Sequence, residues 1–140
     1  NASRGNIARA AMESAIFGMR AGLEAFRALG FRAREIRLIG GGSKSALWRE
    51  IAANVMSLPV KRPANDEAAA MGAAIQALWC LEMEGKKGAD PKAEIARLAD
   101  EHIAINEADC INPDPEKVAA YDKAYAEYNK YLKALSPLYV

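Results

Sequence analysis

The fold is decided by residues 36–60, which read IRLIGGGSKSALWREIAANVMSLPV. The apolar start of this stretch predicts a short strand over residues 35–39, which runs into three glycines and Ser43. A helix is expected to follow from Lys44 to about Ser57, with Ser43 as its N-cap. Its buried side is expected to hold Leu47, Trp48, Ile51 and Val55.

After the first strand and helix, the sequence again predicts a strand followed by a helix. A proline ends the helix, and residues 58–62 predict a second short strand. Asn65 is then expected to cap a third helix that runs to about Glu84. Asp66 and Glu67 fall in the first turn of that helix, where the helix dipole favours negative charge.

The chain before this stretch predicts a long amphipathic helix. Asn6 is expected to act as its N-cap, and Gly30 as its left-handed C-terminal cap. The apolar face, at spacings of four and three, consists of Met12, Ile16, Met19, Leu23 and Phe26. Helices and short strands therefore alternate along the first part of the chain, which is typical of an α/β fold with crossover helices.

From about residue 86 the sequence predicts a helical tail. A short helix is expected from Pro91 to about His102, a loop over residues 106–114, and a final helix from Pro115. The apolar stripe of that last helix consists of Tyr121, Tyr125, Tyr128, Leu132 and Leu135. We expect the stripe to pack on the domain with the tyrosine hydroxyls at its rim, rather than to form a stacking platform.

Length and composition fit one globular domain. The chain has 140 residues, of which 51% are hydrophobic and 26% charged, which excludes a disordered chain and two ordinary domains. Its net charge of +1 creates no field that would attract nucleic acid or an anionic membrane. Two cysteines are too few for a disulfide scaffold and favour a cytoplasmic setting. Of these, Cys80 is expected to act as a small hydrophobe in a buried helix.

Two features of this organisation indicate part of a larger unit. Two strands are too few for an independently stable sheet, so the sheet is completed either by strands outside this sequence or by an oligomer. The chain also opens directly on a helix, after Asn1 and Ala2, which look like an expression scar. We therefore expect residues 3–140 to be a fragment of a larger protein.

The glycine run is the strongest candidate for a ligand site. A strand that ends in glycines before a helix presents backbone N–H groups at the positive end of the helix dipole, and glycine lets a ligand come close. Nucleotide contact is the functional interpretation, and its candidate residues are Gly40, Gly41, Gly42 and Ser43. The run matches neither GxGxxG nor GxxxxGK[ST], so a tight turn without a ligand stays the alternative.

Other residues with chemical potential have simpler explanations. His102 is the only histidine and has no partner at metal-ligand spacing, so no metal role is expected. Asp66 and Glu67 face different directions on a helix, which does not suit paired acid–base work. Residues 71–74 are expected to pack closely, against the sheet or a nucleotide. A basic cluster, assigned to a helix end and a strand edge rather than to nucleic acid, consists of Arg27, Arg32, Arg34 and Arg37.

Residues 36–60 resemble the corresponding stretch of carbohydrate kinases of the FGGY family, in which a Gly-Gly-Gly loop leads into a Leu-Trp-Arg helix start and a Leu-Pro-Val strand. Residues 67–74, EAAAMGAA, resemble the following helix of that family. Residues 6–13, NIARAAME, resemble the second half of its carboxy-terminal signature. Within the family, the central run and the tyrosine-rich tail are most similar to the xylulose kinases. The resemblance extends over residues 4–135.

The resemblance implies an enzyme of two domains with the actin-like, ribonuclease H-like ATPase fold, of which this chain is the later part of the second domain. Such enzymes transfer the γ-phosphoryl group of ATP, with Mg²⁺, to a sugar hydroxyl. D-xylulose is the first expectation, and ribulose, gluconate, fuculose, glycerol and autoinducer-2 are alternatives. A non-catalytic actin-like binding module is the alternative from another functional class.

The resemblance also implies which partners this chain needs. These are ATP, a small sugar and the amino-terminal domain of the same protein, with a homodimer of the full-length enzyme as an open alternative. The catalytic aspartate is implied to lie in the amino-terminal domain, so this chain alone is expected to be inactive.

Only a few residues carry over from the family one by one. Gly41, Gly42 and Ser43 match the loop whose backbone contacts the ribose and phosphate side of the nucleotide. Lys44 is a further candidate for a phosphate. Ala46 stands where glycerol-kinase-like relatives place an asparagine near the adenine, so adenine contact would be apolar or from backbone. Glu13 fits the family signature but is expected to be capping or solvated, not catalytic.

Overall fold

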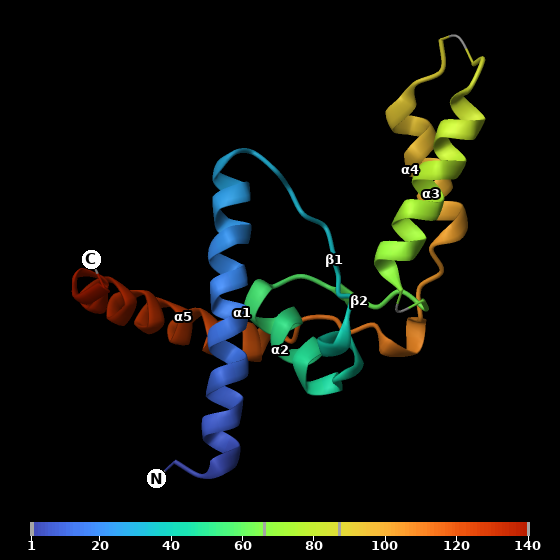
Figure 1. The fold of residues 1–140 in the computed structure, drawn as a ribbon. Helices are drawn as coiled ribbons and strands as arrows, with labels where there is room; N and C mark the ends of the chain where they lie inside the picture. The colour runs from blue at the N-terminus through green and yellow to red at the C-terminus, as the bar shows by residue number, and fades with distance from the viewer. Residues whose placement is uncertain (1, 66, 87, 140) are drawn as a thin grey trace.

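The computed structural model describes residues 2–65, 67–86 and 88–139 as a mostly helical α/β arrangement (Figure 1). Its α-helices are α1 (Arg4–Ala28), α2 (Ala46–Met56), α3 (Ala68–Met83), α4 (Pro91–His102) and α5 (Pro115–Leu135). Its strands are β1 (Ile36–Arg37) and β2 (Val60–Lys61), and three short 3₁₀ turns are η1 (Gly41–Lys44), η2 (Glu107–Asp109) and η3 (Ser136–Tyr139). The expectations for Asn1 and Asp66 lie outside the described residues.

The first helix begins and ends at small residues that satisfy its free backbone groups. Ser3 is the N-cap of α1, and its hydroxyl oxygen accepts a hydrogen bond from the Asn6 amide at 3.2 Å. The predicted N-cap, Asn6, is therefore wrong, because it already lies in the first turn. Gly30 has φ 91°, and the next amide donates back to the Phe26 carbonyl at 3.1 Å. This is a Schellman ending, and it confirms the predicted glycine cap.

The two strands pair over fewer residues than expected, and β2 has an additional neighbour on its far side. β1 pairs with β2 in parallel, with Ile36 opposite Val60, so pairing covers only part of each predicted strand. On the far side of β2, a segment of the tail runs antiparallel: Ile111 bridges Val60, and Ile105 bridges Pro63. The region predicted as loop therefore carries η2 and extends the sheet, because its backbone groups find partners beside β2.

The core lies where α1 and α5 pack against α2. Ile16 and Phe17 of α1 are buried, whereas Met19 and Phe26 of the predicted apolar face are 51% and 59% exposed. That part of the prediction is wrong because α2 and α5 cover a narrower stripe of α1 than the sequence pattern marks. Leu47 is likewise exposed at the start of α2. The buried core cluster consists of Ile16, Phe17, Ile51, Ala52, Ala53, Val55, Met56, Val60 and Tyr125.

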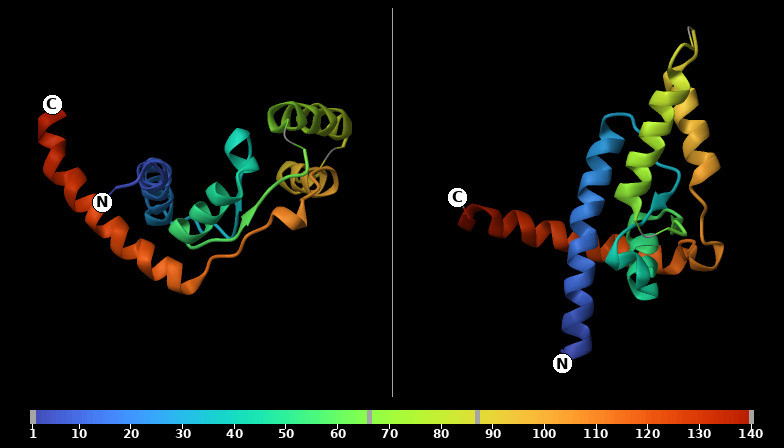
Figure 2. Two further views of the ribbon diagram at one scale, coloured as in Figure 1. Left: turned by 90° about the horizontal axis from the view of Figure 1, so that it is seen from below. Right: turned by 45° about the vertical axis from the view of Figure 1, so that its right-hand side comes forward.

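Tyrosines attach the last helix to the first. The ring of Phe17 lies 5.3–6.3 Å, centroid to centroid, from the rings of Tyr121, Tyr125 and Tyr128. The Tyr121 hydroxyl donates to Glu13 at 2.8 Å and the Tyr125 hydroxyl to a second glutamate of α1 at 3.0 Å. The predicted packing of the tyrosines, with hydroxyls at the rim, is confirmed. The two leucines of the stripe, Leu132 and Leu135, are exposed because α5 continues past α1 (Figure 2).

Helices α3 and α4 form an antiparallel pair that projects from the rest of the chain (Figures 1 and 2). The span of α4 matches the prediction, and the last residue of α3 lies one before the predicted end. Glu67, not Asn65, is the N-cap residue of α3, and the Asn65 side chain instead accepts the Glu67 amide at 2.8 Å. Cys80 is exposed, which corrects its predicted burial, because Ile75 is the buried side chain of this helix.

Among the described helices, none combines the length and hydropathy that a bilayer crossing requires.

Candidate functional site

The glycine run forms a compact turn between β1 and α2. Gly40 has φ 77° and ψ −170°, a backbone region that essentially only glycine adopts. The Ser43 hydroxyl donates to the Gly40 carbonyl at 2.7 Å, and the Ser43 amide donates to the same oxygen at 3.1 Å. Ser43 is 1% exposed. The turn is therefore closed on itself by a buried serine.

The cap of α2 is one serine further along than expected. Ser45 accepts the Trp48 amide through its hydroxyl oxygen at 3.3 Å and is the N-cap, so α2 begins at Ala46. The prediction that Ser43 caps a helix from Lys44 is wrong, because Ser43 is committed to the glycine turn and Lys44 ends η1. The glycine run thus leads into α2 through a short 3₁₀ turn.

The outer surface of this turn is open. Gly41, Gly42, Lys44 and Ala46 are all exposed. A Cβ atom built on Gly41 would meet nothing within 4 Å, whereas one on Gly42 would lie 3.3 Å from Nε1 of Trp48. Gly41 and Gly42 belong to the leading turn of η1, where backbone N–H groups have no helical partner. A ligand can therefore approach this backbone directly.

A buried arginine holds the turn from behind. Arg49 is 6% exposed, and its Nη1 donates to the Ser43 carbonyl at 2.6 Å. Its Nη2 donates to Asp109 of η2, also at 2.6 Å. Sequence reasoning missed both residues. Arg49 lies within the decisive stretch, but no local signal links it to a carboxylate sixty positions later.

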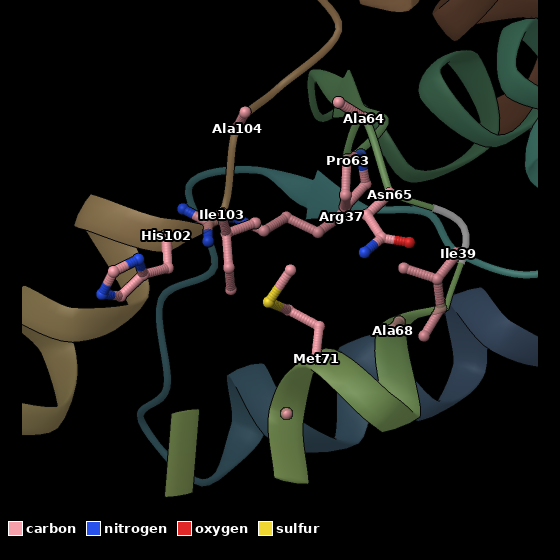
Figure 3. Close-up of a pocket in the computed structure, with 11 residues that line it drawn as sticks. Arg37, Ile39, Pro63, Ala64, Asn65, Ala68, Met71, His102, Ile103 and Ala104 are labelled. Atoms are coloured by element: carbon pink, nitrogen blue, oxygen red, sulfur yellow. The ribbon is translucent and has the colours of Figure 1, made fainter. Parts of the chain in front are cut away.

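A cavity of about 290 Å³ lies beside the turn, between β1 and the start of α3 (Figure 3). Met71 reaches into it from α3, and Ile39, the residue before the glycine run, forms part of its wall. The predicted site residues from Gly40 to Ala46 do not line it. The close packing predicted for residues 71–74 is wrong in part, because Met71 is half-buried and residues 72–74 are exposed.

The other charged residues considered from the sequence form hydrogen bonds and ion pairs that explain them structurally. Glu13 accepts from Arg9 and from Tyr121, both at 2.8 Å. Arg37 donates to Glu35 at 2.9 Å. Lys61 and Arg37 hold the pKa of Glu35 below its ordinary value. Within the ranges that the structure describes, no three His, Cys, Asp or Glu residues gather as a metal site.

Comparison with known proteins identifies relatives over the whole chain. The sequence profile of the FGGY family of carbohydrate kinases, C-terminal domain, matches residues 1–81. A xylulose kinase of Haemophilus influenzae is 41% identical over 139 residues, which are 99% of this chain and 26% of that protein. An L-fuculokinase of Escherichia coli is 38% identical over 76 residues, which are 54% of this chain and 16% of that protein.

Solved structures show the same relationship in three dimensions. The crystal structure of a xylulose kinase from Rhodospirillum rubrum superimposes with a TM-score of 0.76 at 25% sequence identity. The match covers 99% of this chain and 26% of that one. This chain therefore spans about a quarter of the length of the relatives that it matches end to end.

Proposed function

This chain belongs to the FGGY family of carbohydrate kinases, and we propose from that premise that it is the ATP-binding carboxy-terminal portion of a sugar kinase. The reaction is transfer of the γ-phosphoryl group of ATP to a sugar hydroxyl, which leaves ADP and a sugar phosphate. The proposed acceptor is D-xylulose. The fold we infer is the actin-like, ribonuclease H-like ATPase fold, with β1 and β2 as the last strands of a larger sheet.

One observation carries the nucleotide assignment. The parallel strand β1 ends in an exposed glycine turn that leads into a helix, and open α/β sheets bind ligands beyond the carboxyl ends of their strands. The open space outside Gly41 supports close approach of a phosphate or ribose to the backbone. The alternative, a tight turn without a ligand, predicts that filling this space has no effect on nucleotide binding.

The residues of the turn take different parts in the proposal. The backbone of Gly40, Gly41 and Gly42, closed by Ser43, faces the ribose and phosphates. Lys44, exposed at the end of η1, supplies a cation for a phosphate. Ala46 opens α2 without a side-chain hydrogen-bonding group, so the adenine is held there by apolar contact or by backbone.

The proposal assigns neither the catalytic base nor a magnesium ligand to this chain. Phosphoryl transfer depends on positioning and on charge stabilisation, and Mg²⁺ supplies the latter when it is bound with ATP. The described residues do not fit a metal site, since they contain no group of carboxylates that could hold the ion. The proposal therefore assigns the catalytic base to the amino-terminal domain of the full-length enzyme, and it assigns the binding of Mg²⁺ to the nucleotide and that domain.

The acceptor sugar is the least constrained part of the proposal. The end-to-end relatives described above are xylulose kinases, whereas the fuculokinase matches about half of the chain. A panel of D-xylulose, ribulose, gluconate, fuculose and glycerol, tested on the full-length enzyme, decides among them. The isolated 140-residue chain is expected to show no sugar-dependent ATP turnover. Absence of turnover by the full-length protein with every sugar would favour a non-catalytic actin-like module.

The sharpest test of the nucleotide site is Gly41→Val in the full-length enzyme. The new side chain meets no protein atom within 4 Å of its Cβ, so it occupies the space through which a nucleotide would approach. We expect the affinity for ADP, measured by calorimetry, to fall at least roughly tenfold. The matched control is Gly22→Val on α1, whose Cβ is equally unobstructed. Equal ADP affinity in the two variants and the wild type would refute the assignment.

A further inference from the structure

The carboxylate of Asp109 lies at the centre of a cluster of hydrogen bonds behind the glycine turn. One oxygen, Oδ1, accepts from Nη2 of Arg49 at 2.6 Å. The other, Oδ2, accepts from Nη1 of Arg62 at 2.6 Å and from the side-chain amide of Asn106 at 2.8 Å. The side chains of Asp109 and Arg49 are 21% and 7% exposed. Asp109 therefore balances two cations, although about a fifth of its own side chain is exposed.

The backbone around Asp109 is itself anchored beside β2. The Asp109 amide donates to the Asn106 carbonyl at 3.0 Å, and the Asn106 amide donates to the Arg62 carbonyl at 2.9 Å. Ile111 pairs with Val60 two residues further along. The position of the carboxylate is thus set by the segment of the tail that extends the sheet.

Arg49 connects this anchored carboxylate to the glycine turn. Its planar guanidinium uses Nη2 for Asp109 and Nη1 for the Ser43 carbonyl, so fixing one end fixes the other. Ser43 in turn closes the turn through the Gly40 carbonyl. A continuous path of short hydrogen bonds therefore runs from η2 to the backbone that faces the nucleotide in the proposed function.

We propose that Asp109, acting through Arg49, is a positioning residue that holds the glycine turn in its nucleotide-binding conformation. This inference rests on the function proposed above. A turn that is held before the ligand arrives does not have to be ordered on binding, so affinity rises without any added contact. Stability alone is a weaker explanation, because a buried ion pair is often no more stabilising than apolar residues of the same volume.

The test uses the full-length enzyme with Asp109→Asn, which keeps the size of the side chain and removes its charge. Arg49→Lys is the second variant, because it keeps a buried cation but cannot bridge two partners in the guanidinium geometry. The matched control is Asp122→Asn on α5. That change also removes a carboxylate from an arginine pair, with Arg20 at 2.7 Å, away from the glycine turn. The measurements are KM for ATP, KM for the sugar, ADP affinity and hydrogen exchange of the peptide covering residues 40–46.

The proposal predicts a split between the two substrates. KM for ATP rises roughly tenfold in Asp109→Asn and Arg49→Lys, as expected for loss of one charge-assisted hydrogen bond, while KM for the sugar changes less than about twofold. Hydrogen exchange increases in residues 40–46, and Asp122→Asn behaves as the wild type. If Asp109→Asn fails to fold, Arg49→Lys alone decides.

Two results would overturn the proposal. One is unchanged ATP binding and exchange in both variants. The other is a parallel rise of both KM values with faster exchange throughout the chain, which indicates a structural role only. A wild type that does not bind ADP would instead refute the proposed function, and the exchange of residues 40–46 would then decide whether Asp109 orders the turn.

Discussion

Replacing Phe17 by alanine tests whether the contact between α1 and α5 is a principal source of stability. Phe17 is 6% exposed, and its ring lies 6.3, 5.6 and 5.3 Å from three tyrosine rings. Truncating a buried phenylalanine costs about 3–5 kcal/mol through lost burial and the cavity left behind. Aromatic pairing contributes about 0.5–1.5 kcal/mol per pair beyond burial. We therefore expect the free energy of unfolding to fall by about 4 kcal/mol.

The assay is urea unfolding followed by circular dichroism. With a denaturant slope of about 2 kcal/mol per molar urea, the midpoint falls by about 2 M. The matched control is Phe26→Ala on the same helix. Phe26 is 59% exposed and pairs with one ring, Phe31, at 5.9 Å, so its loss costs about 1 kcal/mol or less. Equal urea midpoints for the two variants would refute the view that the contact between Phe17 and the tyrosines, rather than helix propensity, stabilises the packing of α1 and α5.

Three further predictions address titration and backbone strain. Burial is the largest cause of the raised pKa of both Tyr121 and Tyr125, and a hydrogen bond to a glutamate also raises the pKa of each. The stability that these two groups contribute is complete below the pKa of about 10 of an unfolded tyrosine. It is lost as the pH rises through their higher folded pKa values, and urea midpoints measured at alkaline pH should fall accordingly. The Arg97 guanidinium, first among several partners, lowers the pKa of Glu94 to about 2. The contribution of the Glu94 carboxylate to stability is present above about pH 4.5 and is lost as the pH falls toward 2. An NMR titration of its carboxyl carbon with an ordinary glutamate midpoint would contradict this. Ser57 has φ 52°, so Ser57→Gly should raise the free energy of unfolding by about 0.5–1 kcal/mol in thermal unfolding, and a decrease would show that its side chain matters more than its backbone.

Local signals in the sequence placed several helix ends correctly. Pro91 and Pro115 both begin helices, because proline suits the first turn and each follows an aspartate that caps it. Gly30 ends α1 because a residue with positive φ is needed there. These features depend on a few neighbouring residues, which is the range over which sequence patterns are informative.

The features that the sequence did not predict depend on distant partners. Ser43 and Ser45 are equally good caps in isolation, and the choice between them follows from the burial of Ser43 in front of Arg49. The guanidinium of Arg49 is in turn oriented by Asp109 of η2, in the tail segment beside β2. The glycine turn could therefore be located from sequence, whereas the groups that hold it could not.

The contact between α1 and α5 joins parts of the chain that a ribosome makes far apart in time. The hydrogen bond from Tyr125 to Glu24 spans 101 residues, and that from Arg9 to Tyr121 spans 112. At 5–20 residues per second, the apolar stripe of α1 waits about 5–20 s for the tyrosines that cover it. During that interval the side of Phe17 that faces α5 is available to chaperones or to other nascent chains, so synthesis speed over the tail sets how long this side of the first helix stays uncovered.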